Sequence, residues 1–354
     1  MPRSLCSRGI AYALPPATAT PSDTSVIFLF LHGGPSQLET YDLKPTAPSE
    51  IRGPCQPIQT NVPGMDVCER TYGEYVPGIG EGYWRSAWRS PIVTSTGLPD
   101  STLTVSHERL DDRKGLLQQF DRIRRDVDQS HIMDSMDEFN RKAIEILTAD
   151  KARTAFDLAN EDPQLVAQYG QEWGQNALVA RRLVEAGVSF VTISVPGGVK
   201  AMDAPGWDDH AVNIDLPTIM RHRLPVYDQV VTTLINDIYD RGLDQKVLVI
   251  AAGEFGRTPK GTLQPGTATG KLQWGRDHWP GAQSILVSGG GLRMGQVIGA
   301  TDRHAGFPVE RTLDPQDLMA TMYRHLGIDL ATHFPDGSGR PIVITTGTPI
   351  QELL

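Results

Sequence analysis

Histidine and carboxylate side chains gather in three short, glycine-containing stretches of this sequence. These are GWDDH at 206–210, GEFGR at 253–257 and WGRDHWPG at 274–281. Imidazole nitrogen and carboxylate oxygen together form a ligand set for zinc, manganese or iron rather than a thiolate site. The stretches therefore predict a metal centre, and the candidate ligands are Asp208, His210, Glu254, Asp277 and His278.

Each candidate ligand also has a simpler explanation. A single Asp-x-His is usually a hydrogen-bonded turn, and Glu254 could cap a helix that follows a strand. The adjacent pair Asp277 and His278 could lie in a surface turn. Two roles are open for Asp277 within a metal site, because it could bind the ion or accept a hydrogen bond from the far nitrogen of a ligand histidine.

Two arginines, a histidine and a serine could handle an anionic substrate near these stretches. The guanidinium fork matches phosphate or sulfate oxygens, so Arg257 is predicted to orient the anionic group. Arg276 and His32 are predicted to contact the substrate, although either arginine could instead form a structural ion pair. Ser36 follows a Gly-Gly-Pro turn and is a candidate nucleophile, and it equally suits the N-cap of a helix.

Four apolar runs predict the strands that position these side chains. They cover residues 26–32, 188–195, 246–252 and 284–288, and a helical pattern at 228–242 lies between two of them. This alternation predicts an α/β fold, with a mostly parallel sheet and helices on both faces. Ligands bind such sheets at the carboxyl ends of the strands, close to where the three stretches occur.

Length and composition limit the remaining possibilities. A chain of 354 residues can bury a large core. We expect a disordered or vestigial leader at 1–24 and a single domain at 25–354, with a helical insertion at about 107–160. The net charge of −9 without a basic run argues against a general nucleic-acid binder. No run approaches the ~20 apolar residues of a membrane span.

Several longer segments resemble one bacterial family, domain of unknown function 1501. The resemblance covers the chain from about residue 25 to its end, and it is carried by FLFLHGGPSQLETYDLKPTAPSEIRGPCQPIQTNVPG, LDDRKGLLQQFDRIRRDVD, ARRLVEAGVSFVTI, GWDDH, GEFGRTPK, GRDHWPGAQSILVSGGG, GATDRHAGFPVERTLDPQDLMATMYRHLGI and GTPIQELL. That family looks like a branch of the alkaline phosphatase and sulfatase superfamily.

The resemblance implies a metal-dependent hydrolase of sulfate or phosphate esters on an alkaline-phosphatase-like core. It places Asp208, His210, Glu254 and His278 at metal positions. The implied cofactor is a divalent metal ion, first zinc and then manganese or calcium. The implied substrate is a small-molecule or glycan ester, and the implied location is periplasmic or exported, although this N-terminus lacks the family's common twin-arginine leader.

The chain departs from the superfamily pattern in two places, and the second departure favours an alternative function. The superfamily places an aspartate at the end of the first strand, where this chain has His32-Gly33-Gly34. A His-rich stretch that family members carry near the expected nucleophile is also not found. The alternative is a non-catalytic protein on the same fold that binds sulfated or phosphorylated ligands.

Overall fold

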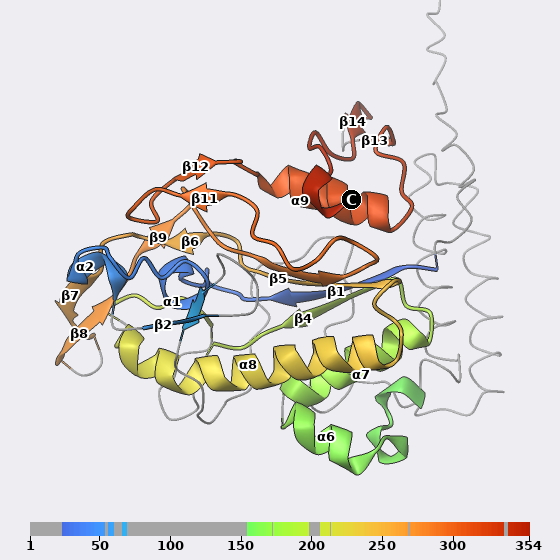
Figure 1. The fold of residues 1–354 in the computed structure, drawn as a ribbon, viewed down its shortest axis with the longest axis horizontal. Helices are drawn as coiled ribbons and strands as arrows, with labels where there is room; N and C mark the ends of the chain where they lie inside the picture. The colour runs from blue at the N-terminus through green and yellow to red at the C-terminus, as the bar shows by residue number, and fades with distance from the viewer. Residues whose placement is uncertain are drawn as a thin grey trace, which may run out of the picture.

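A four-stranded mixed sheet lies at the centre of the computed structural model (Figure 1). The structure describes residues 23–53, 56–59, 66–68, 154–171, 173–197, 206–212, 214–267, 270–335 and 339–354. The sheet has the order β10-β5-β1-β4, and its strands are β1 (Ser25–Phe30), β4 (Phe190–Ser194), β5 (Val247–Ala252) and β10 (Leu286–Gly289). All four predicted strands therefore share one sheet.

The two central strands are apolar on both sides because both faces of the sheet are covered. Every residue of β5 is buried, and Val26, Ile27 and Leu29 of β1 are fully buried. Continuous apolar runs of this kind are typical of parallel strands packed on both faces. β1 pairs in parallel with β4 and β5, and Ile27 lies opposite Val191 on one side and Val249 on the other.

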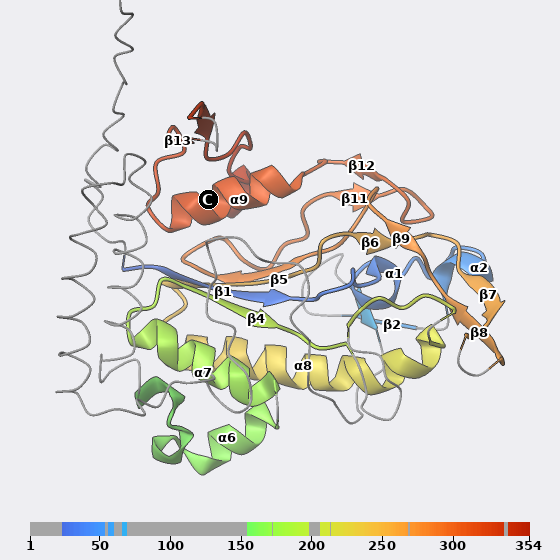
Figure 2. The ribbon, with the colours of Figure 1, turned by 180° about the vertical axis from the view of Figure 1, so that it is seen from behind.

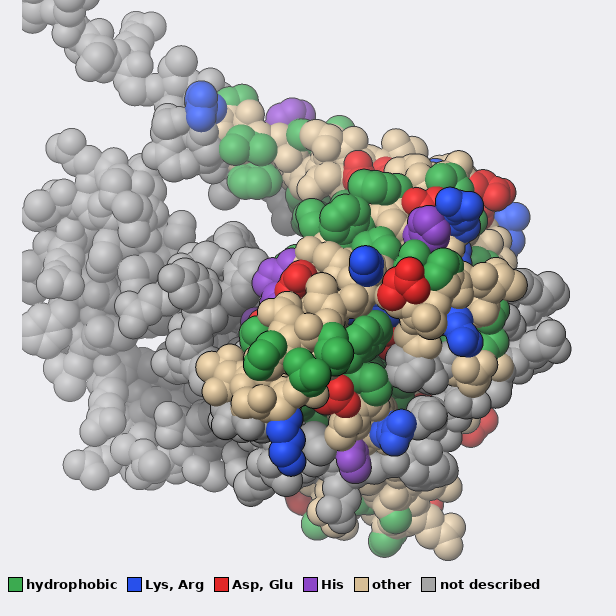
Figure 3. Space-filling model, turned by 90° about the vertical axis from the view of Figure 1, so that its left-hand side faces the viewer, with side chains coloured by type: hydrophobic (Ala, Val, Ile, Leu, Met, Phe, Trp, Pro, Cys, Tyr) green, Lys and Arg blue, Asp and Glu red, His purple; other side chains and the backbone are tan. Residues whose placement is uncertain are grey.

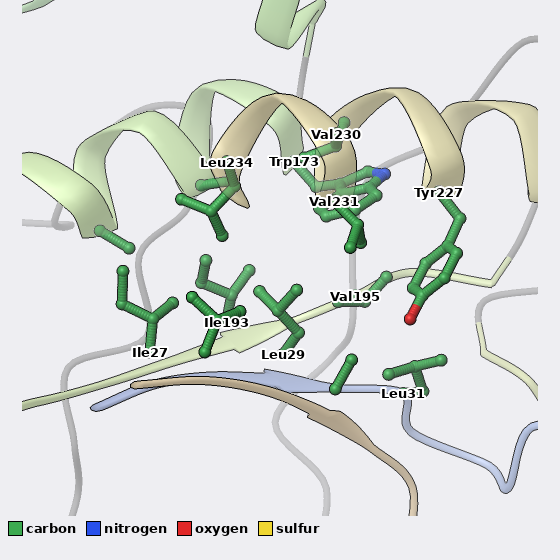
Figure 4. Close-up of a cluster of buried hydrophobic side chains, with 14 of the residues drawn as sticks. Ile27, Leu29, Leu31, Trp173, Ile193, Val195, Tyr227, Val230, Val231 and Leu234 are labelled. Carbon is green, nitrogen blue, oxygen red and sulfur yellow. The ribbon is translucent and has the colours of Figure 1, made fainter. Parts of the chain in front are cut away.

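Helices cover both faces, as Figures 1 and 2 show. On one face, α7 (Trp173–Glu185) and α8 (Leu216–Asp240) pack against Ile27, Leu29 and Ile193 of the sheet (Figure 4). On the other face, Leu318 and Met322 of α9 (Pro315–His325) pack against a cluster that includes Val26. Alternation along β1 sends neighbouring side chains to these two cores.

The direction of β10 decides where the polar loops meet. β10 pairs with β5 antiparallel, and its first residue, Leu286, lies opposite Ala251 near the end of β5. The chain that precedes β10 therefore reaches the same edge at which β1, β4 and β5 end. A parallel β10 would have carried the 274–281 stretch to the opposite edge, so this strand direction is what allows the stretch to join the others.

Shorter elements complete the described chain. The helices are α1 (Gln37–Thr40), α2 (Ser49–Arg52), α6 (Pro163–Tyr169), η1 (Leu158–Asn160) and η3 (Gln351–Leu353). The strands form pairs: β2 (Pro57–Gln59) with β3 (Asp66–Cys68), β6 (Gly256–Arg257) with β9 (His278–Trp279), β7 (Thr262–Pro265) with β8 (Leu272–Gly275), β11 (Ala300–Thr301) with β12 (Pro308–Glu310), and β13 (His333–Pro335) with β14 (Pro341–Val343).

Three predictions about larger segments have different outcomes. The predicted helix at 228–242 lies largely within α8, which begins earlier, at Leu216, and continues past Pro225. The predicted leader lies outside the described residues except for 23–24, and the predicted helical insertion lies outside them except for 154–160. Among the described helices, none combines the length and apolar character needed to cross a membrane.

A buried arginine joins the helices on one face of the sheet. Arg181 of α7 is 1% exposed and donates to Asp237 of α8 at 2.8 Å, to Glu161 at 2.6 Å and to Glu185 at 2.5 Å. Burial raises the pKa of Glu161, but hydrogen bonds from Arg181 and Arg182 outweigh it and lower that pKa to about 2. The ionised form of Glu161 is therefore favoured by folding.

Glu161→Gln should make folding less sensitive to acid. A lowered folded-state pKa stabilises the protein above the unfolded value of 4.5, and this contribution is lost as the pH falls toward about 2. Because Arg181 keeps Asp237 and Glu185 as partners in this variant, we expect a loss of stability on the order of 1 kcal/mol at neutral pH. Urea unfolding between pH 7 and pH 2 measures this loss of stability. The control is Glu310→Gln, a substitution at an exposed position. An unchanged pH dependence in Glu161→Gln would contradict the assignment.

Candidate metal centre

Three of the predicted ligands converge at the carboxyl edge of the sheet. His278 Nε2 lies 2.7 Å from Asp208 Oδ1, His210 Nε2 lies 3.0 Å from the same oxygen, and the two Nε2 atoms are 3.1 Å apart. Two ligands of a tetrahedral zinc ion are roughly 3.3 Å apart when the bonds are about 2.0–2.1 Å. A widening of a few tenths of an ångström would therefore admit the ion, and Asp208, His210 and His278 form a group that could hold a metal.

The loop after β4 presents two of these side chains because its residues alternate in direction. Trp207 and Asp209 are buried, whereas Asp208 is exposed and His210 is partly exposed. The Trp207 indole donates to the Val195 carbonyl at 3.1 Å. Asp209 accepts from Arg223 of α8, with Nη2 at 2.9 Å from Oδ1. The two inward side chains thus anchor the loop and leave Asp208 and His210 facing outward.

A short strand pair brings in the third side chain. β6 and β9 pair antiparallel, so His278 lies opposite Arg257 and Trp279 lies opposite Gly256. The Trp279 indole donates to the Gly306 carbonyl at 2.6 Å, and the ring of Phe255 lies 4.5 Å from that of His278. The WGRDHWPG stretch is therefore anchored by strand pairing and aromatic packing rather than being only a surface turn.

The guanidinium of Arg257 orients Asp208 from below the surface. Arg257 is fully buried and donates to Asp208 Oδ1 at 2.7 Å. Its nitrogens also donate to the carbonyls of Gly33, Gly34, Trp207 and Arg276. Arg257 therefore forms a structural ion pair, the alternative that the sequence left open. These contacts give no support to its predicted contact with an anionic substrate.

The same buried arginine affects the ionisation of Asp208. Partial burial raises the pKa of Asp208, but hydrogen bonds from Arg257 and His278 and the charge of Arg257 outweigh it, leaving the pKa below its usual value. A carboxylate must be deprotonated to bind a metal ion. Asp208 is therefore held in the charge state that a ligand requires.

Arg276 and Ser36 belong to a separate buried cluster. Arg276 is fully buried, and its nitrogens donate to the Glu39 carboxylate and to the carbonyls of Ile51, Thr258 and Pro259. Ser36 is 1% exposed and stands at the N-cap position of α1, but its hydroxyl donates to Glu39. These contacts support neither the predicted substrate contact of Arg276 nor the predicted nucleophilic role of Ser36.

The remaining predicted residues lie outside the group of three. Both carboxylate oxygens of Glu254 accept from the Gly33 N–H at 3.1 Å, and Glu254 is not part of the group. The side chain of His32 is exposed, and its carbonyl accepts from the Trp207 N–H. Asp277 Oδ1 lies 2.8 Å from His210 Nδ1, the ring nitrogen that faces away from the group.

Sequence reasoning missed the residues that hold this arrangement from within, namely Glu39, Asp209 and Arg223. Alternation along Trp207-Asp208-Asp209-His210 was a usable signal, since it separates Asp209 from the two ligand candidates. Arg223 gave no such signal, because an arginine within a helix is ordinarily solvated. Its Nε donates to the Gly197 carbonyl, and its guanidinium lies 4.4 Å from the Trp207 ring.

A comparison with family models gives a match over most of the chain. The model described as protein of unknown function (DUF1501) matches residues 78–354. The chain belongs to the DUF1501 family. This confirms the family resemblance found in the sequence, and the match includes the segments that carry Asp208, His210 and His278. No curated protein and no solved structure matches the chain. Membership of DUF1501 names no activity, so the function has to be argued from the chemistry of the site.

Gly33→Ala should displace the backbone that carries Asp208 in this DUF1501 protein. Gly33 has a φ of +108°, and a Cβ there would lie 2.6 Å from the backbone nitrogen of Asp208. The left-handed conformation alone costs roughly 1–2 kcal/mol for an alanine. The control is Gly187→Ala, because Gly187 has a φ of +100° with nothing within 4 Å of the added carbon.

The difference between these two variants isolates the contact with Asp208. Thermal or urea unfolding should show a larger loss of stability for Gly33→Ala than for Gly187→Ala, since the backbone of 207–208 has to move. Equal losses would show that the close approach of Gly33 to Asp208 does not constrain the site.

Proposed function

We propose that this DUF1501 protein is a metal-dependent hydrolase of sulfate or phosphate esters. The observation that carries the proposal is the convergence of Asp208 Oδ1, His210 Nε2 and His278 Nε2 at one edge of the α/β sheet. We also propose that the core belongs with the alkaline phosphatase and sulfatase superfamily. The mixed sheet with helices on both faces and polar loops at one edge supports that placement.

The donor atoms favour zinc among the candidate metals. Two imidazole nitrogens and one carboxylate oxygen suit zinc or manganese. Calcium takes six to eight oxygen ligands, so this set suits it poorly. Catalytic zinc sites have three protein ligands and an open fourth position, whereas structural sites have four protein ligands. When bound in such a site, zinc polarises an ester oxygen and lowers the pKa of water.

The exposure of the three side chains supports access by a substrate. The side chains of Asp208 and His278 are 45% and 50% exposed, and that of His210 is 22% exposed. Figure 3 views the end of the molecule at which the loops meet, and side chains of both charge signs are interspersed there with apolar ones. Since Arg257 and Arg276 bind protein oxygens, the metal would supply the positive charge that meets the ester.

The alternative is a protein on the same fold that binds sulfated or phosphorylated ligands without cleaving them. The burial of Ser36 on Glu39 favours it, because that contact withholds the one predicted nucleophile. Both functions require the metal centre, and only turnover separates them.

His278→Ala should abolish zinc binding. Removing one of three ligands should weaken zinc affinity more than the roughly 10–100-fold lost when an outer partner of a ligand is removed. Titration calorimetry and elemental analysis of the metal-loaded protein measure this, with His333→Ala on β13 as the matched control. Zinc binding that is equal in wild type and His278→Ala would refute the proposed centre.

Turnover separates hydrolase from binding protein. A panel of aryl sulfate and aryl phosphate esters should be cleaved by the zinc-loaded wild type and not by His278→Ala. Zinc binding and ester binding without cleavage of any panel member would establish the binding protein instead.

A further inference from the structure

We infer that Asp277 is a positioning residue that selects the ring tautomer of His210. Asp277 Oδ1 lies 2.8 Å from His210 Nδ1, on the side of the ring opposite the group of three ligand atoms. An ionised carboxylate only accepts hydrogen bonds, so this contact requires the proton of His210 to be on Nδ1. Asp208 Oδ1 lies 3.0 Å from Nε2, but it already accepts from Arg257 Nη2 and from His278 Nε2, each at 2.7 Å, so it needs no proton from His210. In the neutral ring Nε2 then carries the free lone pair.

That lone pair is directed at the point where the ligand atoms converge. His210 Nε2 lies 3.0 Å from Asp208 Oδ1 and 3.1 Å from His278 Nε2. A metal ligand must be an unprotonated nitrogen, and the partner of the other nitrogen decides which one that is. Asp277 thus prepares Nε2 of His210 for a metal, much as Arg257 keeps Asp208 ionised.

The backbone holds Asp277 in place independently of its side chain. Its carbonyl accepts from the Thr258 N–H at 2.9 Å, and its N–H donates to Thr258 Oγ1 at 3.1 Å. The Asp277 side chain is 53% exposed, so replacing it opens no cavity and leaves no fully buried group without a hydrogen-bond partner. Its neighbour His278 reaches the ligand group directly, whereas Asp277 reaches the outer nitrogen of His210.

The tautomer can be measured without any metal. Long-range ¹H–¹⁵N NMR of the metal-free protein at pH 8 distinguishes the two neutral tautomers, and His210→Gln identifies the His210 signals. We expect the Nδ1–H form in the wild type and a shift toward the Nε2–H form in Asp277→Ala. Asp240→Ala in the last turn of α8 is the matched control and should leave the His210 signals unchanged. The same tautomer in wild type and Asp277→Ala would overturn the inference.

Zinc affinity supplies the second readout, and this part rests on the proposed metal centre. Asp277→Ala should weaken zinc binding by roughly 10–100-fold, and Asp277→Asn by less, because its amide oxygen can still accept from Nδ1–H. Wild-type affinity in Asp277→Ala would overturn the positioning role. If the wild type binds no zinc, the proposed function fails, and the NMR measurement still decides whether Asp277 sets the tautomer.

Discussion

The buried guanidinium of Arg257 is the interaction on which the arrangement of the site depends. Arg257 lies in the segment after β5, and it donates to carbonyls of the segments after β1, after β4 and before β10. A buried carbonyl without a donor costs roughly 1–3 kcal/mol, so these segments could not meet at such close range without it. The fifth contact, with Asp208, connects this buried network to the exposed group of three.

Two further buried arginines also hold loops at the sheet edge, each through an ion pair with a buried carboxylate. Arg276 pairs with Glu39 where α1 and α2 meet the 274–281 stretch, and Arg223 pairs with Asp209 where α8 meets the loop after β4. Buried ion pairs of this kind add little net stability, but losing one partner costs about 3–5 kcal/mol. Their effect here is geometric, since each pair determines the position of one loop at the sheet edge.

The result is a site with a rigid interior and an open outer side. Trp207, Asp209 and the three arginines are buried, whereas the side chains that could bind a metal are partly exposed. Side chains whose positions are already fixed by buried contacts lose little conformational entropy when an ion binds. This favours the affinity of the site for the ion. The contact of Asp277 with His210 adds control over protonation from the solvent side.

The sequence by itself determined the strands, the helices on both faces and the convergence of Asp208, His210 and His278. Each of these follows from local patterns, namely apolar runs, helical periodicity and polar stretches next to strand ends. Only the tertiary structure decided the antiparallel direction of β10, the burial of Arg257, Arg276 and Ser36, and the distinct positions of Glu254 and Asp277. These depend on groups that lie apart in the chain. Gln37 meets Arg257 and Glu39 meets Arg276 across more than 200 residues, and Asp277 meets His210 across 67. The sequence alone does not distinguish an arginine that binds an anionic substrate from an arginine that binds carbonyls of its own chain.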